Sequence, residues 1–166
     1  GAKEVGVEFY SLSKSFNLTG ARISFVVGNK QIINKLKVFR SQIDYGVFLP
    51  VQYAAIAALT GPLDVVEEQR QEYEKRNKML CGGLRSIGWD VPDSQGTMFV
   101  WAKIPGKYKS SVEFCLDLME KTGVIVTPGN AFGSRGEGYV RMALVVGEET
   151  ISELLSVLEE SNIFSK

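Results

Sequence analysis

A lysine near the start of the chain stands among small hydroxyl residues and is followed by an arginine. Ser11 precedes Lys14 by three positions, and Arg22 follows it by eight, two residues after Gly20. A lysine amine at the end of an element can act as a nucleophile toward a carbonyl group. Hydroxyls and a guanidinium fork are suitable ligands of a phosphate dianion. The set as a whole argues against the simplest interpretation of Lys14 alone, a solvated side chain in a turn.

The run around this lysine resembles a known cofactor-binding signature. Residues 11–22, Ser-Leu-Ser-Lys-Ser-Phe-Asn-Leu-Thr-Gly-Ala-Arg, are similar to the fold-type I (aspartate-aminotransferase-like, class I/II) family of pyridoxal 5′-phosphate (PLP) enzymes. The resemblance implies that Lys14 forms the internal aldimine with PLP. It also implies that Lys14 moves the proton between the substrate's α-carbon and the cofactor, and that Ser11 and Arg22 hold the cofactor phosphate. The cofactor itself supplies the chemistry, as an electron sink.

A second group of residues, toward the end of the chain, could bind a substrate. Residues 127–133 (Thr-Pro-Gly-Asn-Ala-Phe-Gly) precede 139–144 (Tyr-Val-Arg-Met-Ala-Leu), the run that contains Arg141. The glycine-rich stretch leads into a strand, not a helix, and so lacks the dinucleotide-binding fingerprint. Without context, Arg141 could be an ordinary edge-strand arginine. Both runs are similar to the substrate-carboxylate segment of the same family, which implies that Arg141 grips the α-carboxylate in a two-bond fork beside Ala131 and Phe132.

Two further segments match this family more weakly. Residues 44–52 look like the segment that reaches the partner subunit's active site in LL-diaminopimelate and alanine-type aminotransferases, the members to which the resemblance is strongest. A loop packed at a dimer surface is an equal alternative for these residues. Residues 96–101 match the family's small-domain strand, and we expect Phe99 and Trp101 in the core, since aromatic residues in strands usually are.

The first third of the chain contains the elements that would position the lysine. Strands are expected over residues 5–10 and 23–27, where apolar and β-branched residues are concentrated. A helix is expected to begin at Asn29 and to run to about residue 43. The next helix, over residues 51–59, is almost wholly apolar. We therefore expect it to be buried on all sides.

The remaining residues alternate between helices and short strands. A long amphipathic helix is expected over residues 63–87, with acidic residues early and basic residues late, as suits the helix dipole. Capping boxes at residues 110–113 and 150–153 predict the starts of two more helices, and Gly123 is placed to end the first of them. Strands are expected over residues 98–104, 124–127 and 139–146, with a glycine-rich loop over 128–138.

These elements predict an α/β chain in two parts. By the resemblance, residues 1–62 are the C-terminal remnant of the large PLP-binding domain of the fold-type I PLP-transferase fold. Residues 63–166 are its α+β small C-terminal domain, which opens with a long linking helix over residues 63–88. The Thr-Gly-Pro break at residues 60–62 marks the boundary between the two parts.

The composition excludes several classes of function. Nineteen basic and nineteen acidic side chains cancel, which leaves no electrostatic footprint for nucleic acid or for an anionic membrane. The chain has no histidine, so Ser-His-Asp and Cys-His catalysis are excluded within it, and no metal site is expected. Cys81 and Cys115 lack metal-ligand spacing and are expected to be reduced thiols in a cytoplasmic protein. A long-range disulfide in a secreted protein is the alternative.

The resemblance covers the whole chain but only the rear part of the family's sequence. It implies a PLP-dependent aminotransferase of amino acid metabolism, a cytoplasmic homodimer that transfers an amino group between an amino acid and a 2-oxo acid. The family's ring-binding aspartate precedes the lysine, so we expect this chain alone to be inactive. Two alternatives stay open: a carbon–sulfur lyase on the same cofactor scaffold, and a non-catalytic, aminotransferase-like module for regulation or dimerisation.

Overall fold

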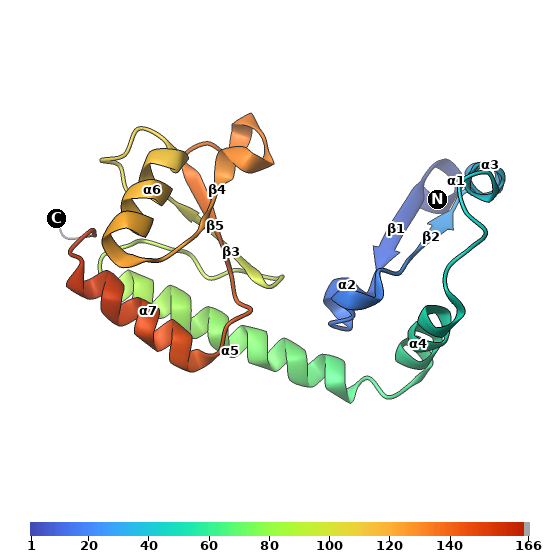
Figure 1. Cartoon of the computed structure of the whole chain (residues 1–166), viewed down its shortest axis with the longest axis horizontal. Coiled ribbons are helices and arrows are strands. Elements are labelled where there is room, and N and C mark those ends of the chain that lie inside the picture. Colours follow the sequence, from blue (N-terminus) through green and yellow to red (C-terminus); the bar gives the residue numbers. More distant parts are fainter. Residues whose placement is uncertain (165–166) are drawn as a thin grey trace. The chain divides into compact units, whose positions relative to one another are not determined.

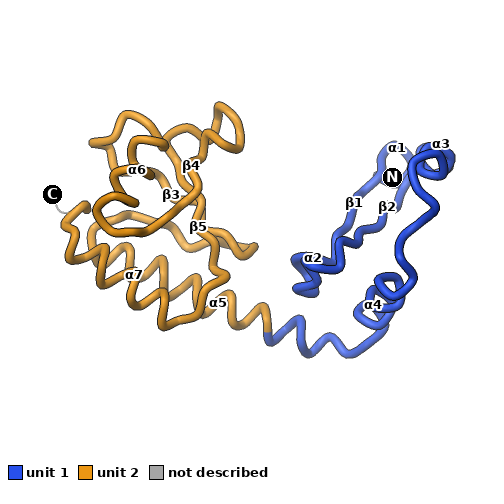
Figure 2. The backbone as a smooth tube through the Cα atoms, in the orientation of Figure 1, with its two compact units in different colours: residues 1–68 blue, residues 69–166 orange. Residues whose placement is uncertain are grey.

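The computed structural model describes residues 1–164, and the chain divides into two compact units (Figure 2). Unit 1 runs from Gly1 to Glu68, and unit 2 begins at Gln69. The boundary between the two units therefore lies inside the long helix α5 (Asp64–Ser86). The expected domain boundary after residue 62 stays a prediction, because compactness does not test which domain of a larger protein each part belongs to.

Unit 1 is built on a two-stranded antiparallel ribbon, formed by β1 (Val7–Ser11) and β2 (Ser24–Gly28) (Figure 1). The first strand starts two residues later than expected, because the residues before it form a helical turn that ends at Gly6. The second strand lies one residue beyond its expected range. The other elements of the unit are α1 (Ala2–Val5), α2 (Leu12–Ser15), the 3-10 turn η1 (Thr19–Ala21), α3 (Lys30–Ser41) and α4 (Leu49–Thr60).

Helix α3 begins where the sequence predicts. The side-chain oxygen of Asn29 accepts hydrogen bonds from the backbone N–H groups of Gln31 and Ile32, at 2.9 and 3.1 Å. A helix leaves its first N–H groups without partners inside the helix, and this cap satisfies two of them.

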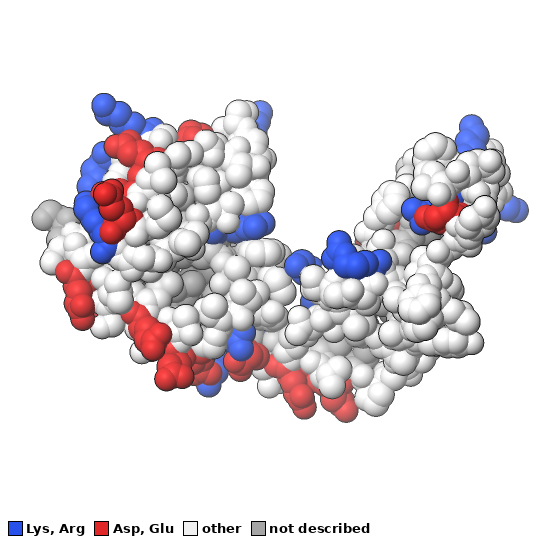
Figure 3. All heavy atoms as spheres, in the orientation of Figure 1, with Lys and Arg blue, Asp and Glu red and all other residues white. Residues whose placement is uncertain are grey.

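Helix α4 was expected to be buried on all sides, and this expectation is wrong. The helix carries no charged residue, yet within the described residues 1–164 only Ala55 of α4 is buried. Tyr53 and Ile56 expose 63% and 54% of their surface. The face of unit 1 seen in Figure 3 is mostly uncharged around this helix. Uniform hydrophobicity predicts burial only where other elements cover the helix, and the ribbon and short helices of unit 1 do not.

Unit 2 combines a three-stranded antiparallel sheet with three helices. The strand order is β3-β5-β4, so β5 is the central strand (Figure 1). Beside α5, the elements are β3 (Phe99–Lys103), α6 (Ser111–Thr122), β4 (Thr127–Pro128), the 3-10 turns η2 (Gly129–Phe132) and η3 (Ser134–Gly136), β5 (Tyr139–Ala143) and α7 (Glu148–Glu160).

One face of the sheet forms the core of unit 2. Val100 and Ala102 of β3 and Val140 and Met142 of β5 are buried and alternate with more exposed neighbours, as the two-residue period of a strand requires. The three helices complete this core with buried side chains that include Leu80, Leu84, Phe114, Leu118, Ile151 and Leu158.

The start and end of α6 agree with the predicted caps. The Ser110 hydroxyl accepts the N–H of Glu113 at 3.1 Å, and Gly123 ends the helix with a left-handed backbone, φ 71°. The second hydrogen bond of a capping box, from the Glu113 carboxylate back to the N–H of Ser110, is not formed, however. The Glu113 carboxylate accepts from the N–H of Lys109 at 2.9 Å, one residue before the cap.

The predicted start of the last helix is wrong. Helix α7 begins at Glu148 after Gly147, two residues before Thr150, and has no side-chain cap. Glu148 and Glu149 occupy its first turn, where the helix dipole favours acidic side chains. The strand expected over residues 124–127 is also shorter than predicted, because only its last residue joins the sheet, in β4.

Within residues 1–164, no single helix is both long and apolar enough to cross a membrane, although the bent pair of α4 and α5 meets that test by length and composition.

Cys81 and Cys115 are free thiols, and burial raises the pKa of both.

Candidate functional site

Lys14 lies on α2, a single helical turn directly after β1. Ser11 is the last residue of β1 and caps this turn, since its hydroxyl accepts the N–H of Ser13 at 3.2 Å. The next residue, Leu12, is completely buried and anchors the turn in unit 1. Strand β1 therefore presents Lys14 at an exposed position beside two hydroxyl groups.

Arg22 returns to the same end of the ribbon through a left-handed backbone. Its φ and ψ are 51° and 45°, a conformation that is uncommon outside glycine and that marks a constrained chain path. One guanidinium nitrogen, Nη1, donates to the carbonyl oxygen of Thr19 at 3.0 Å. A guanidinium has five N–H donors, so this bond orients the group and leaves donors for a ligand.

A shallow cavity of about 260 Å³ brings the predicted phosphate ligands together on unit 1. The lining residues with polar side chains are Tyr10, Ser11, Ser13, Arg22 and Ser24. Lys14 is not among the lining residues but lies one residue after Ser13. Serine hydroxyls and a guanidinium fit the needs of a phosphate dianion.

Arg141 lies on the central strand of the unit 2 sheet, opposite Trp101 of β3 and Thr127 of β4. It is therefore not the edge-strand arginine that the sequence left as an alternative. Its guanidinium carbon lies 4.3 Å from the ring centroid of Phe99 and 4.4 Å from that of Phe132. Cation–π attraction to two rings restricts where the side chain can point and stabilises it there.

The expectation that Phe99 and Trp101 belong to the core is wrong. Phe99 is half-buried and Trp101 exposes 39% of its surface, whereas Val100 between them is completely buried. Successive strand residues point to opposite faces, so the two aromatic residues share the face of Arg141 rather than the core face.

Four aromatic residues gather around Arg141 on this open face. The Trp101 ring stacks on Tyr139 and meets Phe132 edge-on, each at 5.7 Å between centroids. The sequence indicated Phe132 but not the part played by Phe99. Strand alternation combined with the pairing of β3 and β5 was the signal that could have found it.

The loop that carries Ala131 and Phe132 is closed by two glycines. Gly129 and Gly136 approach each other so closely that a Cβ on either one would overlap the backbone of the other. Both are buried. Turns η2 and η3 therefore form one compact unit that presents Phe132 beside Arg141.

Glu137 fastens the end of this loop to helix α6. Its carboxylate accepts the N–H of Ser111 at 2.6 Å, the Ser111 hydroxyl at 3.2 Å and the N–H of Gly138 at 2.9 Å. These bonds, the Ser111 N–H first, hold the pKa of Glu137 below its usual value. No local pattern could have revealed this role, because the partner lies 26 residues earlier.

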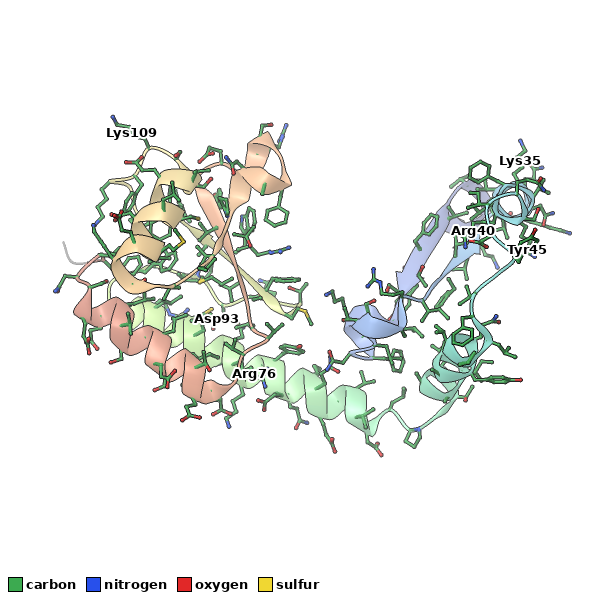
Figure 4. The ribbon with its side chains drawn as sticks, viewed as in Figure 1. Lys35, Arg40, Tyr45, Arg76, Asp93 and Lys109 are labelled. Carbon is green, nitrogen blue, oxygen red and sulfur yellow. The ribbon has the colours of Figure 1, made fainter. Side chains whose placement is uncertain are left out.

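The segment expected to reach a partner subunit, residues 44–52, begins as an exposed turn. Arg40 pairs with Asp44 at 2.5 Å, and the Asp44 carboxylate also accepts the N–H of Gly46 at 3.2 Å. Tyr45 is fully exposed at this turn (Figure 4). Substrate contact and packing at a dimer surface both remain predictions for this segment.

The residues predicted to hold the cofactor belong to unit 1, and Arg141 belongs to unit 2. Comparison with known proteins shows that both units match one protein family. The family model for aminotransferase class I and II matches residues 2–158. The chain belongs to the class I and II aminotransferase family. Its mixed α/β fold is that of this family, which confirms the expected fold class.

Individual members of this family resemble the chain over nearly its whole length. It is 50% identical over 163 residues to the LL-diaminopimelate aminotransferase of Halothermothrix orenii and 43% identical over 157 residues to the glutamate-pyruvate aminotransferase of Escherichia coli. These matches cover 98% and 93% of the chain. The substrate-bound BacF structure from Bacillus subtilis matches 97% of the chain with a TM-score of 0.93 at 36% identity.

The chain spans about two fifths of the length of these relatives: 42% and 38% of the two enzymes and 41% of the BacF chain. Aminotransferases of class I and II generally depend on PLP. The polar lining of the unit 1 cavity is suited to the phosphate of such a cofactor.

Proposed function

We propose that the full-length protein that carries this chain is a PLP-dependent aminotransferase. The amino group of an amino acid would be transferred to a 2-oxo acid, so the donor leaves as a 2-oxo acid and the acceptor leaves as an amino acid. The observation that carries this proposal is the cavity on unit 1 that Ser11, Ser13 and Arg22 line, directly beside the turn that presents Lys14.

The residues of unit 1 fit the two requirements of PLP, a phosphate site and a nearby primary amine. The Ser11 hydroxyl and the Arg22 guanidinium would hold the phosphate through charge-assisted hydrogen bonds. When bound, PLP supplies an electron sink for the electron pair left on the substrate's α-carbon. Lys14 Nζ would take the proton from that carbon and then deliver it to the cofactor. The amine must be unprotonated when it takes the proton.

Arg141 is the proposed ligand of the substrate's α-carboxylate. A guanidinium binds a carboxylate through two parallel N–H donors, and the fork fixes orientation as well as position. Contacts with Phe99 and Phe132 hold the guanidinium in advance, which lowers the entropy lost on binding. The relatives are named for LL-diaminopimelate and for glutamate and pyruvate, so α-amino acids and 2-oxo acids of this kind are the proposed substrates.

The remaining expectations about the whole protein are also proposals. We propose that it acts in the cytoplasm as a homodimer, without nucleic-acid or membrane partners, and that the chain alone is inactive. The balanced charge of the chain supports the absence of a nucleic-acid partner. The exposed apolar surface of α4 supports burial against further protein in the complete molecule.

The test follows the amino nitrogen. Full-length protein is supplied with PLP, pyruvate and either L-glutamate or LL-diaminopimelate labelled at the amino nitrogen. We expect the label in L-alanine, and we expect Lys14→Ala to abolish the transfer. Lys3→Ala is the matched control, since Lys3 is an exposed lysine on α1. No label in L-alanine, together with release of a thiol and ammonia from an amino acid that has a carbon–sulfur bond, would favour the lyase instead. Transfer that survives in Lys14→Ala would refute the role of this lysine.

A further inference from the structure

Thr97, the residue two positions before Phe99, has an unusual backbone conformation. Its φ is 69°, in the left-handed region. For a β-branched residue this is a genuine outlier, because the branched Cβ crowds the backbone there. Such a conformation persists only where the surroundings impose it, and residues of this kind are concentrated at functional sites.

The hydroxyl of Thr97 bridges both backbone polar groups of Phe99. The hydroxyl oxygen accepts the Phe99 N–H at 3.1 Å, and the hydroxyl O–H donates to the Phe99 carbonyl oxygen at 3.4 Å. One hydroxyl can do both, since it has one donor and two acceptor positions.

The strand register explains why Phe99 needs such a partner. Leu144 donates its N–H to the Met98 carbonyl at 2.8 Å, so Met98 and Leu144 are a hydrogen-bonded pair just before β3 and just after β5. Hydrogen-bonded and non-bonded pairs alternate in an antiparallel ladder, and Phe99 is opposite Ala143 in the next, non-bonded pair. The N–H and C=O of Phe99 therefore point away from β5, to the open edge of the sheet, where no further strand pairs with β3 in the described chain.

Thr97 thus takes the place of a neighbouring strand at Phe99, the β3 residue whose ring lies over the Arg141 guanidinium. The ring of Phe99 lies 4.3 Å from the guanidinium carbon of Arg141. The second ring in contact with this guanidinium belongs to Phe132, which lies on a separate loop. If the start of β3 shifted, the Phe99 contact would change while the Phe132 contact stayed. The guanidinium would then lose one of the two rings that orient it.

We infer that Thr97 is a positioning residue for carboxylate recognition: its hydroxyl fixes the start of β3, this places the Phe99 ring, and the ring orients Arg141. The inference rests on the proposed function, in which Arg141 binds the substrate's α-carboxylate. The left-handed conformation of Thr97 is the geometry that brings its hydroxyl across Phe99.

The experiment compares the binding of L-glutamate with that of its α-carboxamide, using the full-length, PLP-loaded protein. The two ligands differ only in the group that Arg141 would read. Thr97→Val keeps the shape and branching of threonine but removes the hydroxyl. We expect it to weaken binding of L-glutamate roughly five- to tenfold, the size of a lost hydrogen bond, and to leave the carboxamide almost unchanged. Thr97→Ser keeps the hydroxyl and is expected to restore the preference.

Two further variants separate this role from general destabilisation. Thr97→Gly tolerates a positive φ and has no hydroxyl, so it should lose the same preference without a strained backbone. Thr122→Val is the matched control. The Thr122 hydroxyl also bridges two backbone groups, donating to the Leu118 carbonyl at 2.6 Å and accepting the Val124 N–H at 3.2 Å, but at the end of α6. It should leave the preference for the carboxylate intact.

The outcomes distinguish this inference from the proposed function. If Arg141→Ala removes the preference for the carboxylate but Thr97→Val and Thr97→Gly keep it, Thr97 has no positioning role and the proposed function stands. The same conclusion holds if Thr122→Val lowers the preference as much as Thr97→Val. If Arg141→Ala keeps the preference, or the full-length protein transfers no amino group, the proposed function itself fails and the inference falls with it.

Discussion

The carboxylate of Glu137 binds both the backbone N–H and the hydroxyl of Ser111, at 2.6 and 3.2 Å. Ser111 is the first residue of α6, and its side chain is completely buried. An acidic side chain from a distant loop therefore stabilises the start of a helix, where the N–H groups lack partners and the dipole favours negative charge. The same contact holds the end of the loop that presents Phe132 to Arg141.

This contact predicts a pH dependence of stability. The folded-state pKa of Glu137 is lowered from 4.5, so its contribution is fully present above about that pH and is lost as the pH falls through the folded-state value. Denaturant unfolding of wild type and Glu137→Gln should differ most near neutral pH and converge in acid. Glu153→Gln, at an exposed position on α7, is the control and should show no such convergence. A constant difference at all pH values would contradict the charged contact.

Arg22 should matter for the phosphate of the cofactor and not for its ring. For Arg22→Ala we expect PLP to bind about 10- to 100-fold more weakly, since hydrogen bonds to charged groups are worth about 1.5–3 kcal/mol. Binding of pyridoxal, which lacks the phosphate, should barely change. Equilibrium dialysis of the full-length protein with both ligands measures this, and Arg40→Ala provides a control at an arginine engaged elsewhere, with Asp44. An equal loss for both ligands would show that Arg22 acts on the fold and not on the phosphate.

Arg141→Ala should raise the apparent KM for the amino donor about 10- to 100-fold while PLP stays bound, by the same charge-assisted magnitude. Arg141→Lys should recover only part of this loss, because a point charge cannot form the two-bond fork. Steady-state kinetics and the cofactor's absorption are measured together. Arg135→Ala tests an exposed arginine of the same loop and should behave as wild type. Loss of PLP from Arg141→Ala would overturn the assignment.

Two adjacent glycines in α5 should respond in opposite ways to the same substitution. A Cβ at Gly83 would overlap the Leu155 side chain of α7, whereas a Cβ at Gly82 meets nothing within 4 Å. We expect Gly83→Ala to destabilise the protein by about 1–3 kcal/mol through overpacking. Gly82→Ala should stabilise it by about 0.5–1 kcal/mol, because alanine favours a helix interior. Denaturant midpoints of the two variants test this, and a stabilised Gly83→Ala would mean that the flexible end of the Leu155 side chain moves aside at little cost.

Features set by neighbouring residues could be predicted from the sequence. The Asn29 cap, the Ser110 cap and the Gly123 terminus all depend on atoms within a few residues of each other. The family resemblance grouped Ser11 with Arg22, and the antiparallel ribbon returns both residues to one end.

Features set by distant partners could not be predicted in this way. The apolar composition of α4 says that the helix can be buried but not that anything covers it. We expected Trp101 in the core because it is aromatic. Strand alternation instead places Val100 in the core and Trp101 on the open face. Glu137 and Thr97 gave no signal, since one acts on a helix far away in sequence and the other through a backbone conformation unusual for its residue type.

The mutual approach of Gly129 and Gly136 limits how this loop can evolve. In a core, a larger side chain at one position can be accommodated by a smaller one opposite. Here each glycine faces the other's backbone, which no substitution can shrink. The two positions therefore cannot compensate for each other, and we expect the loop to tolerate larger side chains only at the residues between them. Phe132 lies in that interval, so the surface beside Arg141 can be remodelled without disturbing the closure that supports it.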